Sequence, residues 1–347
     1  MPTVRIRCWL WALASVLVGL GLPARAEISY QTGHGLDLGD VNVAGYANLV
    51  GEMPQDRRTS LKLDDMSLFV TGHVNRIFNP FVELERTNQP LFYGTGPHTL
   101  ADQPNMVLER IYNDTYLSDE FTLRAGKMHA PVGEWNQIHA APLVLTTTRP
   151  LATQRGFSAY VSGASLLYVD AADELPEIQV YWQPVEDLAV RPKTLTRRRF
   201  RDVEGAHVNW PIGLTDKIGV SFQRSRTVGS DEDQLVYGAN AKYSFYGFSI
   251  DAEATVSSIS GGNRPLYRRN EGGAYVLGSY ALSEQWSVFS WYEHYVDRRE
   301  KAQASDALFG VAFRPIPSVV LKVERVKNFD ANWGNPTGYF ASLAVMF

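Results

Sequence analysis

Apolar and polar side chains alternate through many stretches of this chain. In residues 248–258, Phe248 and Ile250 fall on one face, whereas Asp251 and Glu253 fall on the other. A period of two residues is typical of a β-strand whose two faces meet different environments. The pattern therefore predicts strands with one apolar face and one polar face.

The last stretch of the chain alternates in the same way and ends on an aromatic residue. Its apolar face carries Tyr339, Leu343, Val345 and Phe347. An exposed apolar strand edge invites pairing with other chains, and a closed barrel removes that edge by pairing its last strand with its first. We therefore predict that this stretch closes a barrel. The terminal strand of a soluble β-sandwich is the alternative.

Sixteen such stretches are predicted, and turn-forming residues separate them. They span residues 41–52, 62–75, 80–86, 104–117, 121–129, 158–169, 176–184, 202–210, 216–227, 234–245, 248–258, 272–282, 286–297, 307–314, 318–327 and 337–347. Two of them, 107–117 and 158–169, lack a convincing alternation, so their inner faces stay unassigned.

The connections between these stretches alternate between short and long. Those after the even-numbered strands are short, whereas nearly all of those after the odd-numbered strands are longer and rich in Gly, Pro, Asn and charge. Outer-membrane barrels have short periplasmic turns, longer external loops and an even number of strands. The chain is therefore predicted to be all-β, an antiparallel transmembrane β-barrel of about 16 strands.

The first 26 residues differ from the rest. Arg5 and Arg7 precede an apolar run over residues 9–22, and Ala24 and Ala26 occupy the small-residue positions of a cleavage site. These features predict a secretory signal peptide over residues 1–26 and a barrel domain over 27–347. A membrane anchor would need a longer apolar run, and no later run of about 18 apolar residues predicts a transmembrane helix.

Composition narrows the chemistry of the barrel domain. The one cysteine, Cys8, falls in the predicted signal peptide, so residues 27–347 contain no disulfide, thiol nucleophile or cysteine metal ligand. The formal net charge is −4, and the balance becomes more acidic without the signal peptide's arginines, which argues against nucleic acid as a partner. The seven histidines are scattered, and neither a His-Glu-x-x-His nor a Gly-x-Ser-x-Gly motif is present. We predict no enzyme, cofactor or metal site.

Three stretches of the first half resemble Gram-negative porins, and the phosphate-selective type most closely. They are residues 63–72, 79–85 and 123–136, and the third carries Arg124-Ala125-Gly126-Lys127 before a Pro131-Val132-Gly133 turn. The resemblance implies a passive, usually trimeric channel in the outer membrane of a Gram-negative bacterium. It also implies contacts with outer-membrane lipid and lipopolysaccharide, and recognition of the C-terminal strand by the barrel-assembly machinery.

In porins the third external loop folds inward and narrows the lumen, so the resemblance nominates residues 130–157 as the constriction. Its predicted charged residues are Arg124, Lys127, Arg149 and Arg155 on the positive side and Glu83, Glu85 and Glu134 on the negative side. Such a pore sorts solutes by width and by rings of charge. Each residue has an alternative interpretation as a solvated external charge or a salt bridge.

A run of arginines stands out in a later external loop. It contains Arg197, Arg198, Arg199 and Arg201, and it predicts an extracellular basic patch. Such a patch would bind lipopolysaccharide, gather anions at the channel mouth, or be a solvated loop tip. Two other functions stay open for the whole chain: a barrel enzyme of the outer-membrane phospholipase kind, and a surface-binding barrel that does not conduct.

Overall fold

The structure is a computed structural model, and it describes residues 28–95, 104–172, 174–188, 198–213, 215–262, 268–298, 303–330 and 333–347. The predicted signal peptide lies outside these residues. Among the residues described, no helix is long and apolar enough to cross a membrane. A short 3-10 turn, η2 (Leu151–Thr153), belongs to the long connection between β7 and β8.

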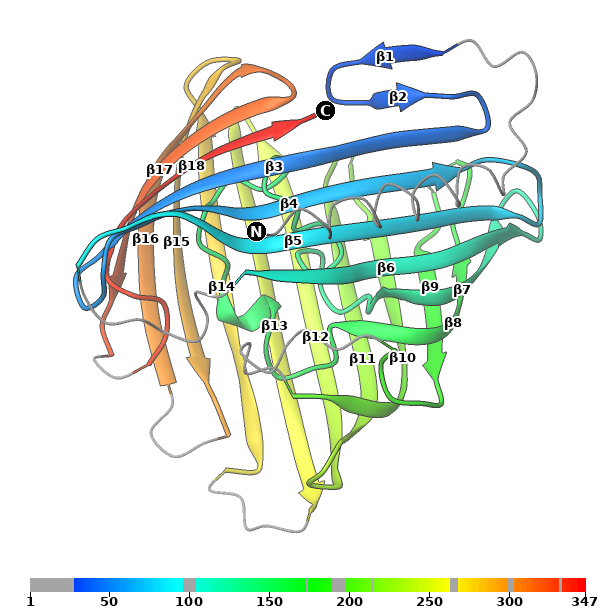
Figure 1. The fold of residues 1–347 in the computed structure, drawn as a ribbon. Helices are drawn as coiled ribbons and strands as arrows, with labels where there is room; N and C mark the ends of the chain where they lie inside the picture. The colour runs from blue at the N-terminus through cyan, green and yellow to red at the C-terminus, as the bar shows by residue number, and fades with distance from the viewer. Residues whose placement is uncertain are drawn as a thin grey trace, which may run out of the picture.

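Sixteen antiparallel strands form a closed barrel (Figure 1). Each strand pairs with the next along the chain, and the last pairs with the first. The strands are β3 (Val41–Pro54), β4 (Ser60–Gly72), β5 (Asn79–Tyr93), β6 (Asn105–Tyr116), β7 (Phe121–His129), β8 (Tyr160–Tyr168), β9 (Glu177–Gln183), β10 (Phe200–Pro211), β11 (Lys217–Thr227), β12 (Glu232–Phe245), β13 (Phe248–Gly261), β14 (Asn270–Ala281), β15 (Trp286–Val296), β16 (Gln303–Ile316), β17 (Val319–Asn328) and β18 (Gly338–Met346). The predicted fold class and number of strands are confirmed.

The C-terminal strand closes the barrel as predicted. β18 pairs with β3, with Leu343 opposite Leu49. Beyond it, the backbone of Phe347 exchanges two hydrogen bonds with Gly45, at 2.8 and 2.9 Å. A small hairpin of β1 (Ser29–Gln31) and β2 (Gly35–Asp37) then continues along β3. These pairings give the backbone groups along the edges of β3 and β18 hydrogen-bonded neighbours, which is what the sequence analysis predicted for the last stretch.

Alternate residues of each strand meet different surroundings. On β17, Leu321 and Val323 are 41% and 58% exposed on the outer surface, whereas Lys322 and Glu324 are each 1% exposed. A charge that faced lipid near the bilayer midplane would cost about 2–4 kcal/mol. The outward residues of this strand are therefore those that a membrane accepts, and the charged ones point inward.

Connection lengths divide the barrel into two ends. The turn between β12 and β13 consists of Tyr246 and Gly247, both with positive φ. Two such residues suit the type I′ turn that joins neighbouring strands tightly. The long connections gather at the opposite end, and residues 130–159 form the connection between β7 and β8.

Two departures from the predicted strands have a common cause. β5 continues to Tyr93, seven residues past the predicted end at Arg86, and it contains Asn88 at a φ of 53°. β6 lacks alternation because the register slips between Glu83 and Leu84 of β5, which leaves Glu109 without an opposite residue. A β-bulge adds one residue to a strand and changes the direction of the side chains that follow. A search for a strict period of two therefore misses strands that contain bulges.

Candidate functional site

Residues 130–159, hereafter the inner loop, connect β7 with β8 and contact buried side chains of β13, β15 and β17. Glu324 of β17 anchors the loop's centre, because its two carboxylate oxygens accept hydrogen bonds from the backbone N–H groups of Thr147 and Thr148 at 2.8 and 2.7 Å. Beside it, Lys322 donates to the carbonyl oxygen of Ala141 at 2.7 Å. The inward-facing charges of β17 thus bind loop backbone.

Two further buried glutamates act in the same way on other strands. Glu253 of β13 accepts a hydrogen bond from the N–H of Trp135 at 2.8 Å. Glu293 of β15 accepts one from the N–H of Ala152, also at 2.8 Å. Hydrogen bonds between a carboxylate and backbone N–H groups are stronger than neutral ones. Three alternate strands therefore hold the loop through its backbone. These bonds do not depend on which side chains the loop carries.

The start of the inner loop depends on a glycine and an asparagine. Gly133 has a φ of 67°, and an added Cβ would lie 2.0 Å from Glu253 Oε2. Glycine is therefore required for the loop to approach the wall at this point. Asn136 donates to the carbonyl oxygens of both Ala130 and Ala159, at 2.8 and 3.0 Å, and so ties the two ends of the loop together.

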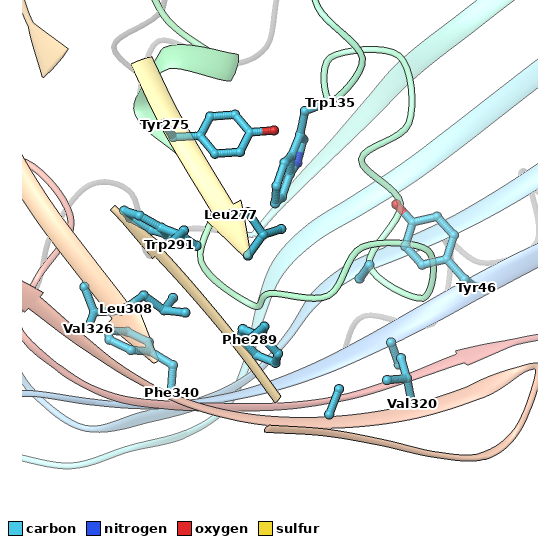
Figure 2. Close-up of a cluster of buried hydrophobic side chains, with 13 residues drawn as sticks. Tyr46, Trp135, Tyr275, Leu277, Phe289, Trp291, Leu308, Val320, Val326 and Phe340 are labelled. Atoms are coloured by element: carbon cyan, nitrogen blue, oxygen red, sulfur yellow. The ribbon is translucent and has the colours of Figure 1, made fainter. Parts of the chain in front are cut away.

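Apolar packing adds to these polar anchors. Trp135 of the loop meets Tyr275 of β14 edge to face, with ring centroids 5.7 Å apart (Figure 2). Both belong to a buried cluster that also contains Leu277, Trp291 and Leu308 from neighbouring strands. Edge-to-face aromatic pairs contribute about 0.5–1.5 kcal/mol beyond their buried area. Part of the interior is thus filled by a small core.

Two spaces of about 200 and 300 Å³ lie beside the inner loop. They share four lining residues: Asp64 of β4 and Thr147, Arg149 and Gln154 of the loop. These residues mark where the two spaces meet. A guanidinium on the loop and a carboxylate on the wall therefore both border this junction.

The guanidinium of Arg149 is held in place by its own loop. It donates to Thr153 Oγ1 at 3.0 Å, to the Thr153 carbonyl oxygen at 2.6 Å and to Asn136 Oδ1 at 3.3 Å. These three bonds fix the position of the guanidinium within the loop.

Other predicted pore residues are distributed along the inner wall. Glu85 lines the first of the two spaces. Glu83 forms an ion pair with Arg110, and Arg124 forms a two-pronged pair with Asp114 in which both N···O distances are 2.8 Å. The structure therefore brings Glu85 and Arg149 to the lining of one space and places Glu83 and Arg124 in wall ion pairs.

Glu134 sits at the start of the loop in a dense polar cluster. Its carboxylate accepts hydrogen bonds from Lys217 and Asn209, and its Oε1 lies 3.7 Å from His207 Nε2. Burial favours the neutral acid, but His207, Lys217 and Asn209 beside the carboxylate outweigh burial and lower the pKa of Glu134 to about 2. This residue therefore remains ionised and fixes the loop to β10 and β11.

Two predicted residues lie away from the junction. Lys127 is fully buried and donates to the Leu108 carbonyl oxygen at 2.8 Å. Arg155 lies 4.0 Å from Asp297 and packs over the ring of Trp333, 4.9 Å from its centroid. Neither lines the two spaces that meet at Arg149.

The arginine run is more neutral than its sequence indicates. Arg197 lies outside the described residues. Each of the other three has an acidic partner: Arg198 with Glu271, Arg199 with Glu186, and Arg201 with Asp231. An Nη atom of Arg198 also lies 3.4 Å from Asp297 Oδ1. With two acidic partners, Arg198 does not contribute an unpaired charge to an exposed basic patch.

Several functional residues were missed by the sequence analysis. Asp64 and Gln154 carry no signal in a single sequence, because only the folded loop brings them to one place. An aromatic row on the inner wall was also missed; successive ring centroids are 5.0–6.0 Å apart along Tyr46, Phe69, Phe81 and Tyr112. The sequence analysis assigned none of these rings to a face, and Tyr112 falls in a stretch that lacks a convincing alternation.

The closed barrel, the apolar exterior and the charged interior define a transmembrane β-barrel of the outer-membrane type. No family model matches the chain, and no curated protein matches it. Among solved structures, the chain is similar to outer-membrane expressed OmpT of Vibrio cholerae, with 10% identity, a TM-score of 0.61, and coverage of 92% of this chain and 99% of that one.

Two further solved structures share the fold. The anion-selective porin from Comamonas acidovorans is 13% identical with a TM-score of 0.58, and the match covers 88% of this chain and 98% of that one. Salmonella typhi OmpF in complex with daunomycin is 12% identical with a TM-score of 0.60, and the match covers 92% of this chain and 99% of that one. At such identities the likeness establishes the fold.

Proposed function

We propose that this protein is a passive channel for small hydrophilic or ionic solutes. The observation that carries the proposal is the junction of two spaces at Asp64, Thr147, Arg149 and Gln154. Charged and hydrogen-bonding side chains border it, as water and ions require. Selection by width and by fixed charge needs no reaction and no cofactor.

The anchoring of the inner loop supports this proposal. A loop that only decorated the outer surface would not need buried carboxylates from three strands to hold its backbone. The bonds from Glu253, Glu293 and Glu324 instead keep an obstacle of fixed shape in the interior. The inner loop would therefore act as the constriction.

The similar structures add support at the level of the fold. Two of them are described as porins or as OmpF, and one OmpT structure is described as a trimer form. We extend to this chain the proposal of a homotrimer embedded in outer-membrane lipid and lipopolysaccharide. Chemical cross-linking of the purified protein tests the trimer, because a ladder that stops at the dimer would contradict it.

Reconstitution in a planar lipid bilayer tests the channel. The full chain, refolded and purified in detergent, is expected to insert with stepwise increases in ion conductance. Folding is checked separately by the heat-dependent shift in gel mobility that stable barrels show. A correctly folded barrel that stays electrically silent would contradict the channel and favour a surface-binding barrel.

One observation favours a second candidate, a barrel enzyme that acts on lipids. His294 of β15 and Ser305 of β16 are directly opposite each other, and their side chains are hydrogen-bonded at 3.0 Å. His294 is exposed on the outer surface. A serine beside a histidine is the minimal arrangement of an activated nucleophile. Among the described residues, no carboxylate or amide is bonded to the other ring nitrogen of His294 to orient it.

Phospholipid hydrolysis in mixed micelles distinguishes this candidate from the channel. An enzyme predicts ester cleavage that is abolished in Ser305→Ala, while Ser287→Ala on the neighbouring strand retains it. The channel predicts no cleavage by the wild type and unchanged conductance in Ser305→Ala.

A further inference from the structure

The inner loop meets the wall at a second cluster that the channel does not require. Glu109 of β6, His129 at the end of β7 and His139 of the loop bring one ligand atom each within 4.8 Å of one another. Two imidazoles and a carboxylate form a donor set that suits zinc and its neighbours among divalent metals. Their sequence spacing follows no metal-binding motif, so the sequence analysis did not find them.

The separations are close to those of a coordination shell. His129 Nε2 and His139 Nε2 lie 3.6 and 3.8 Å from Glu109 Oε1. Ligands about 2.0–2.1 Å from a tetrahedral zinc are about 3.3–3.4 Å apart. These two separations exceed that value by a few tenths of an ångström, and the three ligand atoms all lie within 4.8 Å of one another, so the side chains would move inward to close around an ion.

The state of the two histidine rings also fits. His139 Nδ1 lies 3.2 Å from the Asn136 carbonyl oxygen, which fixes the proton on Nδ1 and leaves Nε2 as an acceptor facing Glu109. Histidines that bind metals are commonly oriented by such a bond to a backbone carbonyl.

His129 supplies a second, independent observation. Its side chain is 93% buried, since only 7% of it is exposed. Neither of its ring nitrogens has a hydrogen-bond partner. A buried polar group without a hydrogen bond is destabilising, and a bound ion would give Nε2 a partner.

The surroundings give the site support and access. The bulge in β6 leaves Glu109 without an opposite residue, and Tyr160 donates a hydrogen bond to its carboxylate. His139 lines the first of the two spaces, so an ion has a route from the interior. The guanidinium of Arg110, the residue after Glu109, is paired with Glu83, which offsets its repulsion of a cation.

We propose that Glu109, His129 and His139 bind one divalent transition-metal ion of the zinc class, with water from the lumen as a fourth ligand. The ion would join the inner loop to β6 and β7, on the side of the barrel opposite to the glutamate anchors. It would be a permanent tie of the constriction rather than a transported solute.

Zinc binding to the purified, metal-stripped full chain tests this site. The wild type is expected to retain one Zn²⁺ per chain after dialysis. His139→Gln and Glu109→Gln are expected to weaken binding by roughly tenfold or more. His207→Gln is the matched control, since His207 is also buried beside a carboxylate but belongs to no cluster of three possible ligands among the described residues, and it should retain the ion.

A second measurement does not depend on the folding of any variant. Co²⁺ added to the wild type should give the intense visible absorption of a four-coordinate site, and Zn²⁺ should abolish it. The site is refuted if Co²⁺ shows only the weak spectrum of the hydrated ion. It is equally refuted if His129→Gln/His139→Gln, shown to be folded by its gel mobility, retains as much Zn²⁺ as the wild type.

Discussion

Arg149 and Asp64 border the same junction from opposite structural elements, one on the inner loop and one on β4. The guanidinium is oriented by oxygens of Thr153 and Asn136 and lines both spaces. A fixed charge in a narrow region of low dielectric raises the local concentration of counter-ions. These two residues are therefore expected to set the sign of ion selectivity.

Substitution of these residues should move the selectivity in opposite directions. Arg149→Gln removes a positive charge and should shift the reversal potential in a salt gradient toward cation preference, whereas Asp64→Asn should shift it toward anion preference. Arg226→Gln, on the outer surface of β11, is the control. If the reversal potential of Arg149→Gln equals that of the wild type, Arg149 does not line the passage.

At the scale of the elements, the fold consists of a wall and a loop that is tied to it. Glu253, Glu293 and Glu324 come from strands spaced two apart, and each binds the backbone of the inner loop. Gly133 provides the close approach that the first of these bonds needs. The loop is therefore held as a rigid part of the barrel.

Removal of one anchor should loosen the loop without opening the barrel. Glu324→Ala leaves the N–H groups of Thr147 and Thr148 without their acceptors, which costs about 1–3 kcal/mol for each donor that water does not reach. We expect noisier single-channel currents and a lower temperature for the heat-dependent gel shift. Glu204→Ala, an exposed glutamate of β10, is the control. Currents as quiet as those of the wild type would show that Glu324 does not hold the constriction.

The sequence predicts the wall far better than the site, and particular residues show why. Leu321 and Lys322 are neighbours that need opposite surroundings, so lipid and water impose the alternation locally. The site depends on pairs far apart in the chain, such as Thr147 with Glu324, which are separated by 177 residues. Glu109 was missed for another reason, because a bulge breaks the period on which the prediction of its strand relied.

At the scale of the whole molecule, the account requires a cylinder with an apolar outside and a wet inside. Alternate residues of one strand provide the contrast: Val323 is 58% exposed on the outer surface, whereas Glu324 is buried within. Outward residues would contact acyl chains, and residues at the junction would contact water. The same small reagent should therefore distinguish the two sets.

Thiol labelling during single-channel recording tests this contrast most directly. In a chain with Cys8 replaced, Gln154→Cys places a thiol at the junction and Val323→Cys places one on the outer surface. A charged, water-soluble methanethiosulfonate reagent is expected to lower the conductance of Gln154→Cys in a step that a reducing agent reverses, and to leave Val323→Cys unchanged. A Gln154→Cys channel whose current is insensitive to the reagent would contradict a water-filled passage past the inner loop.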